Sequence, residues 1–170
     1  MTIISDRNHS NVLEEGTLRD IRAELPAVVS IVTTADNQGT PYGATVSSMV
    51  SLSLEPPLLL VCLESNSDTL AALEVGGGFV VNVASEEQQK TAFAFSKKGP
   101  EKFETTNWVL NSSGLPKLVD SAIVFDCVVT SLIQEGDHTI VVGHISNLEQ
   151  SNEPRPLIYR HRKMHTSPTA

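Results

Sequence analysis

The sequence holds few of the residues that build disulfide frameworks or thiolate metal sites. Only two cysteines occur in 170 residues, Cys62 and Cys127, and each lies inside an apolar run. There is no CxxC pair and no ligand spacing typical of a metal site. We therefore expect both cysteines to behave as small buried hydrophobic residues, with no disulfide and no metal.

Positive charge and long apolar runs are also scarce. Twelve Lys and Arg stand against 20 Asp and Glu, a formal net charge of −8, which argues against a nucleic-acid surface because such a surface needs a concentrated positive field. The longest apolar runs, such as residues 58–63, are too short to cross a bilayer. Residues 1–10 lack the pattern of a signal peptide. We expect a cytoplasmic protein without membrane contact.

One small group of basic residues lies near the end of the chain. It has two interpretations of equal weight, a solvated tail or a contact to the phosphates of a dinucleotide. The group consists of Arg155, Arg160, Arg162 and Lys163.

Length and composition predict one globular domain. A chain of 170 residues with 40% hydrophobic and 19% charged residues can bury its own core and is not of a disordered class. Polar, aperiodic residues at the start predict a flexible arm over residues 1–16. We expect one domain over residues 17–165 and a C-terminal tail over residues 166–170.

The hydrophobic pattern predicts mainly strands with a few short helices. Thr17 and Asp20 resemble a capping box, as do Ser85 and Gln88. Residues 96–118 lack periodicity, which indicates a long loop. Strands without regular strand–helix alternation favour an antiparallel β-barrel with helical decoration. The expected strands cover residues 27–35, 40–48, 58–64, 79–84, 122–134, 138–148 and, as an extended piece, 154–159; the expected helices cover residues 17–25, 69–75 and 85–95.

Short hydroxyl side chains are concentrated after the second expected strand. Small residues let a ligand approach the backbone, and hydroxyls with free N–H groups hold an anionic or carbonyl-rich ligand. For a single Ser or Thr in a β-rich protein, a turn or solvent-facing role is the more common one. The cluster consists of Thr45, Ser47, Ser48, Ser51 and Ser53, and it ends at Glu55-Pro56-Pro57.

The glycine run Gly76-Gly77-Gly78 is no dinucleotide fingerprint. Such a fingerprint follows a strand and opens a helix, whereas this run follows an expected helix and precedes a strand. We interpret it as the end of the helix.

Several segments, taken in order, resemble the flavin reductase family. A GxTxSS turn, a serine-rich step, a proline-opened strand, a short polar turn, an FxVN strand and a late GDH turn occur in the family's order with similar spacing. The pieces are Gly43 to Ser48, Ser51 to Pro57, Asn66 to Thr69, Phe79 to Val83 and Gly136 to His138.

This resemblance implies a fold, an activity and partners. The fold is a split β-barrel, usually a homodimer with the flavin site near the subunit interface. The activity is NAD(P)H-dependent reduction of FAD or FMN, with the reduced flavin passing to a separate monooxygenase. NADH is the expected donor, with NADPH as the alternative.

The resemblance also assigns a flavin site. The ring is expected at the hydroxyl turn, the sugar-like chain at the end of the next strand, and the phosphate at a predicted helix start. Lys98 is equally well a solvated charge. The cofactor-binding set is Thr45, Val46, Ser47, Ser48, Cys62, Leu63, Ser67, Thr69, Asn82, Val83, Phe95 and Lys98.

A second assignment concerns the nicotinamide. The family's GDH histidine lies beside the nicotinamide, so His138 is expected to position it, with Asp137 fixing the turn; a plain turn-capping role is the alternative. Tyr159 matches an aromatic on the nicotinamide side, or packs at the end of the barrel. His144, and an RHRKMH segment where the family closes on glycine and tyrosine, depart from the family pattern. They leave the choice between NADH and NADPH open.

Two other functions remain open from the sequence. One is a flavin-dependent oxidase or oxygenase that acts on its own substrate, although the chain leaves little sequence for a separate substrate pocket. The other is a flavin- or haem-binding module without catalysis.

Overall fold

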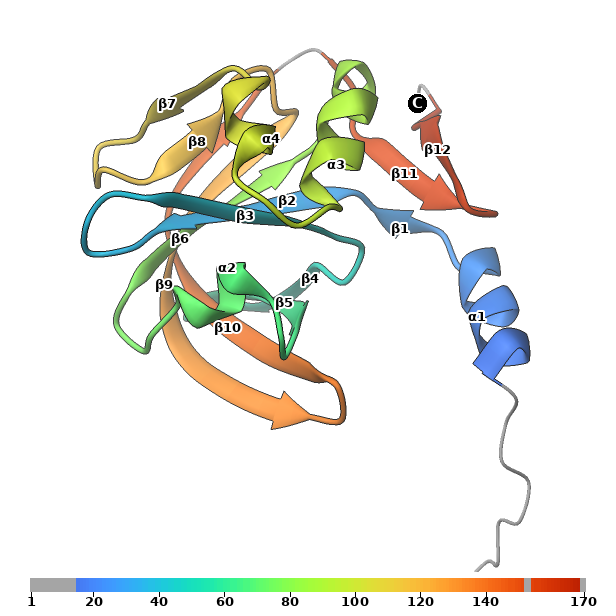
Figure 1. Ribbon diagram of the computed structural model, residues 1–170, viewed down its shortest axis with the longest axis horizontal. Coiled ribbons are helices and arrows are strands. Elements are labelled where there is room, and N and C mark those ends of the chain that lie inside the picture. Colours follow the sequence, from blue (N-terminus) through green and yellow to red (C-terminus); the bar gives the residue numbers. More distant parts are fainter. Residues whose placement is uncertain (1–14, 152–153, 169–170) are drawn as a thin grey trace, which may run out of the picture.

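A seven-stranded antiparallel sheet forms the body of the protein (Figure 1). The computed structural model describes residues 15–151 and 154–168. The strand order is β3-β2-β6-β9-β10-β5-β4, so β3 and β4 are the two edges of the sheet. The strands are β2 (Ser30–Ala35), β3 (Pro41–Val46), β4 (Val50–Leu54), β5 (Pro57–Glu64), β6 (Gly78–Val83), β9 (Ile123–Glu135) and β10 (His138–Gln150).

Smaller elements surround this sheet. A three-stranded sheet in the order β1-β11-β12 lies at one end, beside the first helix, and a two-stranded hairpin packs near the third and fourth helices (Figure 1). The elements are α1 (Glu15–Glu24), β1 (Ala27–Val28), α2 (Asp68–Ala71), the 3₁₀ turn η1 (Glu86–Gln88), α3 (Gln89–Phe95), α4 (Glu101–Glu104), β7 (Trp108–Leu110), β8 (Pro116–Leu118), β11 (Leu157–Arg160) and β12 (Lys163–Thr166).

Strand periodicity explains how the core forms. Successive side chains of a strand point to opposite faces, and in β5 the buried positions are Leu59, Val61 and Leu63. They pack with Phe79 in one hydrophobic cluster. A second cluster gathers around Phe95 and the hairpin β7–β8. The expected architecture, mainly antiparallel β with short helices, is confirmed.

The segment that leads into the second cluster starts after Ser85 as predicted, but its first turn is the 3₁₀ turn η1 and the α-helix begins at Gln89. The side-chain oxygen of Gln88 accepts a hydrogen bond from the backbone N–H of Ser85 at 3.1 Å, which is the returning half of a capping box. The helix ends at Phe95, the predicted residue.

The other two helix predictions were less accurate. Helix α1 begins at Glu15, so Thr17 lies inside it and the capping box read at Thr17 and Asp20 is wrong. Helix α2 ends at Ala71, four residues before the predicted end, and residues 72–77 form turns that lead into β6. The glycine run therefore opens β6 and does not end the helix.

Two segments expected to be irregular contain regular structure. Residues 50–54 form the edge strand β4, because Val50, Leu52 and Leu54 alternate with the serines. The expected loop 96–118 contains helix α4 and the hairpin β7–β8. Strand β12 was also not expected.

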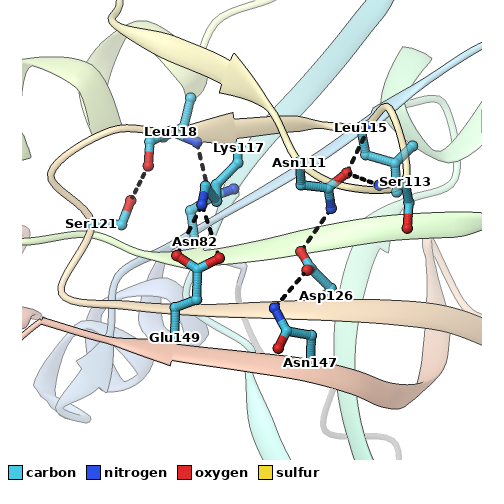
Figure 2. A network of polar contacts seen from close by, with 10 residues as sticks. All are labelled: Asn82, Asn111, Ser113, Leu115, Lys117, Leu118, Ser121, Asp126, Asn147 and Glu149. Atoms are coloured by element: carbon cyan, nitrogen blue, oxygen red, sulfur yellow. Dashed lines mark hydrogen bonds and ion pairs between the residues drawn. The ribbon is translucent and has the colours of Figure 1, made fainter.

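Polar side chains attach the hairpin β7–β8 to the main sheet (Figure 2). The Asn82 amide is central to this attachment. It donates to the carbonyl of Ile31 at 2.9 Å and to the hydroxyl of Thr33 at 3.0 Å, and its oxygen accepts the N–H of Leu118 at 2.9 Å. The hydroxyl of Thr33 donates in turn to the carbonyl of Pro116.

A second attachment holds the turn of the same hairpin. The carboxylate of Asp126 accepts the amide of Asn111 at 2.8 Å and that of Asn147 at 3.1 Å. Farther along, Lys117 donates to both oxygens of Glu149 at 2.9 Å (Figure 2). The hairpin is therefore fixed at both ends.

The arginines near the end of the chain contact other parts of the protein. Arg155 pairs with Glu86 at 3.0 Å. Arg160 donates to the carbonyl of Glu24 at 3.1 Å, and Arg162 pairs with Asp20. These contacts join β11 and β12 to α1 and η1.

Candidate functional site

A cavity of about 540 Å³ opens beside the edge strand β3. Strands β3 and β5 border it, and the hydroxyl of Ser48 bridges them by accepting the N–H of Cys62 at 2.9 Å and donating to its carbonyl at 3.1 Å. This volume lies within the range of small-molecule sites. The lining residues are Arg22, residues 43–48 and 62–64, Ser67, Asp68, Thr69, residues 95–98, Lys102 and His138.

Most of the residues assigned from the sequence lie together in this cavity. The structure brings ten cofactor-binding candidates to its wall, with His138 at the same site. The ten are Thr45, Val46, Ser47, Ser48, Cys62, Leu63, Ser67, Thr69, Phe95 and Lys98.

The hydroxyls in the wall have different partners. Thr45 donates its hydroxyl to the carbonyl of Ala92 at 2.8 Å, and Ser48 bridges to β5. Within residues 15–151 and 154–168, the hydroxyls of Ser47, Ser67 and Thr69 make no hydrogen bond, so their donors are available to a ligand.

Phe95 closes one side of the cavity. A Cβ atom at Gly43 would stand 2.7 Å from the Phe95 ring, so the glycine is what allows the ring to lie against β3. The ring also meets Phe103 edge to face at a centroid distance of 4.9 Å, and Phe103 meets Trp108 at 5.8 Å. This aromatic row connects the cavity wall to the hairpin β7–β8.

His138 enters the cavity from a tight turn. Gly136 and Asp137 connect β9 to β10, and Gly136 has a φ of +60°, which glycine adopts without strain. Nδ1 of His138 lies 2.7 Å from the Asp137 carboxylate, and the His138 side chain is 37% exposed. The hydrogen bond from His138 lowers the pKa of Asp137. The carboxylate thus holds one ring nitrogen and leaves Nε2 for a ligand.

Four basic side chains also line the cavity, in a protein that is acidic overall. Arg22 comes from α1, and Lys97, Lys98 and Lys102 follow α3. The sequence assignment contained only Lys98; the repeated lysines of the KKGPEK segment were the available signal for Lys97 and Lys102, and no local signal pointed to Arg22. Glu64 and Asp68 are the acidic side chains in the wall.

Three assigned residues do not line the cavity. Asn82 is fully buried, and its amide is engaged by Ile31, Thr33 and Leu118. Val83 is a core residue of the same strand. Tyr159 packs against the second hydrophobic cluster, in β11.

Two kinds of feature are absent from the described part of the chain. Among those residues there is no group of His, Cys, Asp or Glu that could hold a metal ion. None of the helices described there is long and apolar enough to span a membrane. Both cysteines are free; Cys127 is buried, while Cys62 is partly exposed at the cavity.

Comparison with known proteins gives a consistent result. Residues 22–168 match the family model described as "Flavin reductase like domain". The chain is 37% identical to the reductase subunit HsaB of a flavin-dependent monooxygenase from Rhodococcus jostii, over 88% of this chain and 76% of that one. It is 36% identical to a flavin reductase (NADPH) from Lentzea aerocolonigenes, over 96% and 95% of the two chains.

A solved structure agrees with these relatives. The NADH:FAD oxidoreductase SgcE6 of Streptomyces globisporus, in complex with NAD and FAD fragments, superposes with a TM-score of 0.83. The two chains are 27% identical, and the match covers 91% of this chain and 93% of that one.

Proposed function

Because this chain belongs to the flavin reductase-like family, we propose that it is an NAD(P)H-dependent flavin reductase that reduces FAD or FMN and supplies the reduced flavin to a separate monooxygenase. One observation carries the proposal: free hydroxyls, basic side chains and an oriented histidine meet in one cavity of about 540 Å³. When both substrates are bound, hydride passes from the nicotinamide to the flavin ring.

The donor set of the cavity fits a flavin. A flavin ring needs hydrogen-bond donors for its carbonyls and apolar cover for its dimethylbenzene edge, and its phosphate needs hydroxyls or cations. In the turn from Thr45 to Ser48, the free hydroxyl of Ser47 supplies a donor for the ring, and Phe95 supplies apolar cover. Cys62 and Leu63 border the sugar-like chain.

At the other end of the flavin, the phosphate meets hydroxyls near a group of basic side chains. Ser67 and Thr69 have free hydroxyls in the cavity wall, and Lys97, Lys98 and Lys102 line the same cavity, with Nζ of Lys98 3.5 Å from the carbonyl of Asn66. These groups suit FMN and FAD equally, because both flavins carry this phosphate.

In this proposal the chain's own contribution is alignment. His138 presents Nε2 at the cavity, and Asp137 holds its ring, so the histidine binds and orients the nicotinamide. Asn82 and Val83 support the cavity from the core, and Tyr159 packs at the end of the barrel. NADH and NADPH are both retained as donors.

The protein is also proposed to act as a homodimer. None of the residues of α1 is buried, although Ile21 and Leu25 on and after this helix are apolar and about 60% exposed. An amphipathic helix gains its stability from burying its apolar face. A second copy of the chain is the proposed cover, and the expected cytoplasmic location stays a prediction.

Nicotinamide oxidation with FAD, with FMN and without flavin tests the proposed function. Loss of reduced-nicotinamide absorbance that depends on added flavin is the expected result, and the rates rank the two flavins. Bound flavin without nicotinamide oxidation would instead indicate a binding module. Oxygen consumption that requires an added organic substrate would indicate a one-component oxidase or oxygenase.

A further inference from the structure

Lys102 differs from the other basic residues of the cavity in its surroundings. Lys97 and Lys98 are exposed, whereas Lys102 is partly buried and lines the cavity wall. Its Nζ donates to the carbonyl of Lys97 at 3.0 Å and stands 5.6 Å from the centroid of the Phe95 ring. The ammonium group is therefore held in a fixed place at the edge of the cavity.

No carboxylate neutralises this ammonium group directly. Among the described residues, Lys102 forms no ion pair, although the charges of Asp68 and Glu101 act on it from a distance. Burial outweighs these two charges and lowers the pKa of Lys102. A cation that has lost part of its hydration without gaining a counter-ion binds an anion more strongly than an exposed one does.

The cavity wall offers matching donors for such an anion. The free hydroxyls of Ser67 and Thr69 line the same cavity, and the charge of Asp68, next to both, reaches Lys102. Building on the proposed function, we propose that Lys102 is the cation that holds the phosphate ester of the flavin and makes the site selective for phosphorylated flavins over riboflavin.

Lys98 is the less suitable of the two lysines for this role. It is exposed, and exposed charges are screened by water and salt, so that they contribute little to an ion pair. The ammonium group of Lys102, which lies over the Phe95 ring, is in surroundings of lower dielectric constant than that of Lys98. A charge-assisted hydrogen bond is stronger in such surroundings.

Titration of flavin fluorescence with riboflavin, FMN and FAD tests the assignment. We expect Lys102→Met, which keeps the apolar stem over Phe95, to weaken FMN and FAD binding by about tenfold or more, with riboflavin changed by no more than about twofold. Lys90→Met, an exposed substitution of the same kind on α3 outside the cavity, serves as the control with unchanged affinities. Lys98→Met should reduce FMN affinity less than Lys102→Met does.

Two results would overturn the assignment. An equal loss for riboflavin and FMN in Lys102→Met would mean that the lysine only supports the cavity wall. A loss in Lys98→Met as large as that in Lys102→Met would move the role to Lys98.

The unmodified protein provides a second test that does not depend on a variant folding. Its preference for FMN over riboflavin should fall as salt is added and as pH rises toward the lowered pKa of Lys102. Inorganic phosphate should compete with FMN and FAD but not with riboflavin. Equal binding of FMN and riboflavin at low salt would overturn the role of Lys102 and leave the reductase proposal standing. Binding of none of the three flavins would contradict the reductase proposal itself.

Discussion

At the scale of single residues, His138 has an orientation that is set before any ligand arrives. Its Nδ1 is engaged by Asp137 at 2.7 Å, which leaves Nε2 as the ring nitrogen for the proposed contact with a nicotinamide. We expect His138→Ala to raise the KM for NADH by about three- to tenfold, the value of one hydrogen bond, with kcat changed little. Steady-state kinetics at saturating flavin measure both constants.

A variant of Asp137, the hydrogen-bond partner of His138, is the matched comparison for His138→Ala. Asp137→Asn keeps a side chain of the same shape but removes the charge, so its KM for NADH should lie between the values of the native protein and of His138→Ala. The hydrogen bond from His138 lowers the pKa of Asp137. The charged carboxylate therefore holds the imidazole ring at any pH above this lowered pKa, and the contact is lost as the pH falls through the pKa. An unchanged KM for NADH in His138→Ala would contradict the nicotinamide role and leave His138 a structural role in the turn.

The two thiols provide a second residue-scale prediction. Burial raises the pKa of Cys127 to about 12, so near neutral pH almost no reactive thiolate forms there. Cys62 is partly exposed in the cavity wall. We expect a thiol-specific alkylating reagent to modify Cys62 first and Cys127 only on unfolding or at strongly alkaline pH.

Peptide mass spectrometry over time separates the two sites. FMN should slow the modification of Cys62, because its side chain borders the proposed place of the flavin. Faster modification of Cys127, or no protection of Cys62 by FMN, would contradict this prediction. Cys62→Ser is the control that removes the fast phase.

At the scale of elements, the hairpin β7–β8 depends on a few buried polar contacts. Asn82 is fully buried and connects β2, β6 and β8 through three hydrogen bonds, of which Figure 2 shows the one to Leu118. We expect Asn82→Ala to lower the free energy of unfolding by about 2–4 kcal/mol, because it leaves buried donors and acceptors without partners. Urea unfolding measures this loss.

Asn82→Ala also distinguishes a structural role of Asn82 from contact with the cofactor. At a temperature where Asn82→Ala remains folded, its affinity for FMN should stay within about threefold of the native value. A second variant, Asn82→Asp, keeps an oxygen for the N–H of Leu118 but cannot donate to Ile31 or Thr33, so it separates the two halves of the network. A large loss of FMN affinity without a loss of stability would indicate that Asn82 contacts the flavin, as predicted from the sequence.

The element scale also shows which parts of the fold the sequence predicts. Strands β5, β6, β9 and β10 have strong apolar runs bounded by turn residues, and their positions were predicted within a few residues. The return of the Gln88 side chain to Ser85 follows from local spacing alone. These features depend on neighbours in the sequence.

The parts that were not predicted depend on distant residues. Strands β7 and β8 have only three residues each, and they are ordered by Asn82, Thr33 and Asp126, which lie on other strands. No local period reveals such contacts. Strand β4 was missed for another reason: its serines suggested a binding segment and hid the alternation of Val50, Leu52 and Leu54.

The candidate site shows the same division. Residues in the ordered motifs, from Thr45 to Thr69, lie together at the cavity, because the motif order fixes their strands. Arg22 and Lys102 were not found, since α1 and α4 reach the cavity only through the packing of the whole molecule. Asn82 belongs to a matching motif yet points its amide into the core.

At the scale of the whole molecule, one side of α1 attaches it to β11 and to the turn before β12. Asp20 and Glu24 on this helix meet Arg162 and Arg160, and the N–H of His161 bonds to the carbonyl of Ala23. Leu18, Ile21 and Leu25 occupy another face, with no buried position among them, and α1 stands beyond β1 at the end of the molecule (Figure 1). An apolar face of this kind is unfavourable in water and suits a subunit interface.

The position of α1 also connects assembly to the site, because Arg22 of this helix lines the cavity. A charge on the apolar face should separate the proposed subunits, since burying an unpaired carboxylate at an interface is costly. We expect Ile21→Glu to convert a dimer into a monomer in sedimentation-velocity experiments and to weaken FMN binding, because the helix that carries Arg22 loses its proposed cover. Gln89→Glu, which adds the same charge at an exposed position of α3, should remain dimeric with native affinity. A native protein that sediments as a monomer at micromolar concentration would contradict the dimer, and an Ile21→Glu monomer with native FMN affinity would show that assembly and flavin binding are independent.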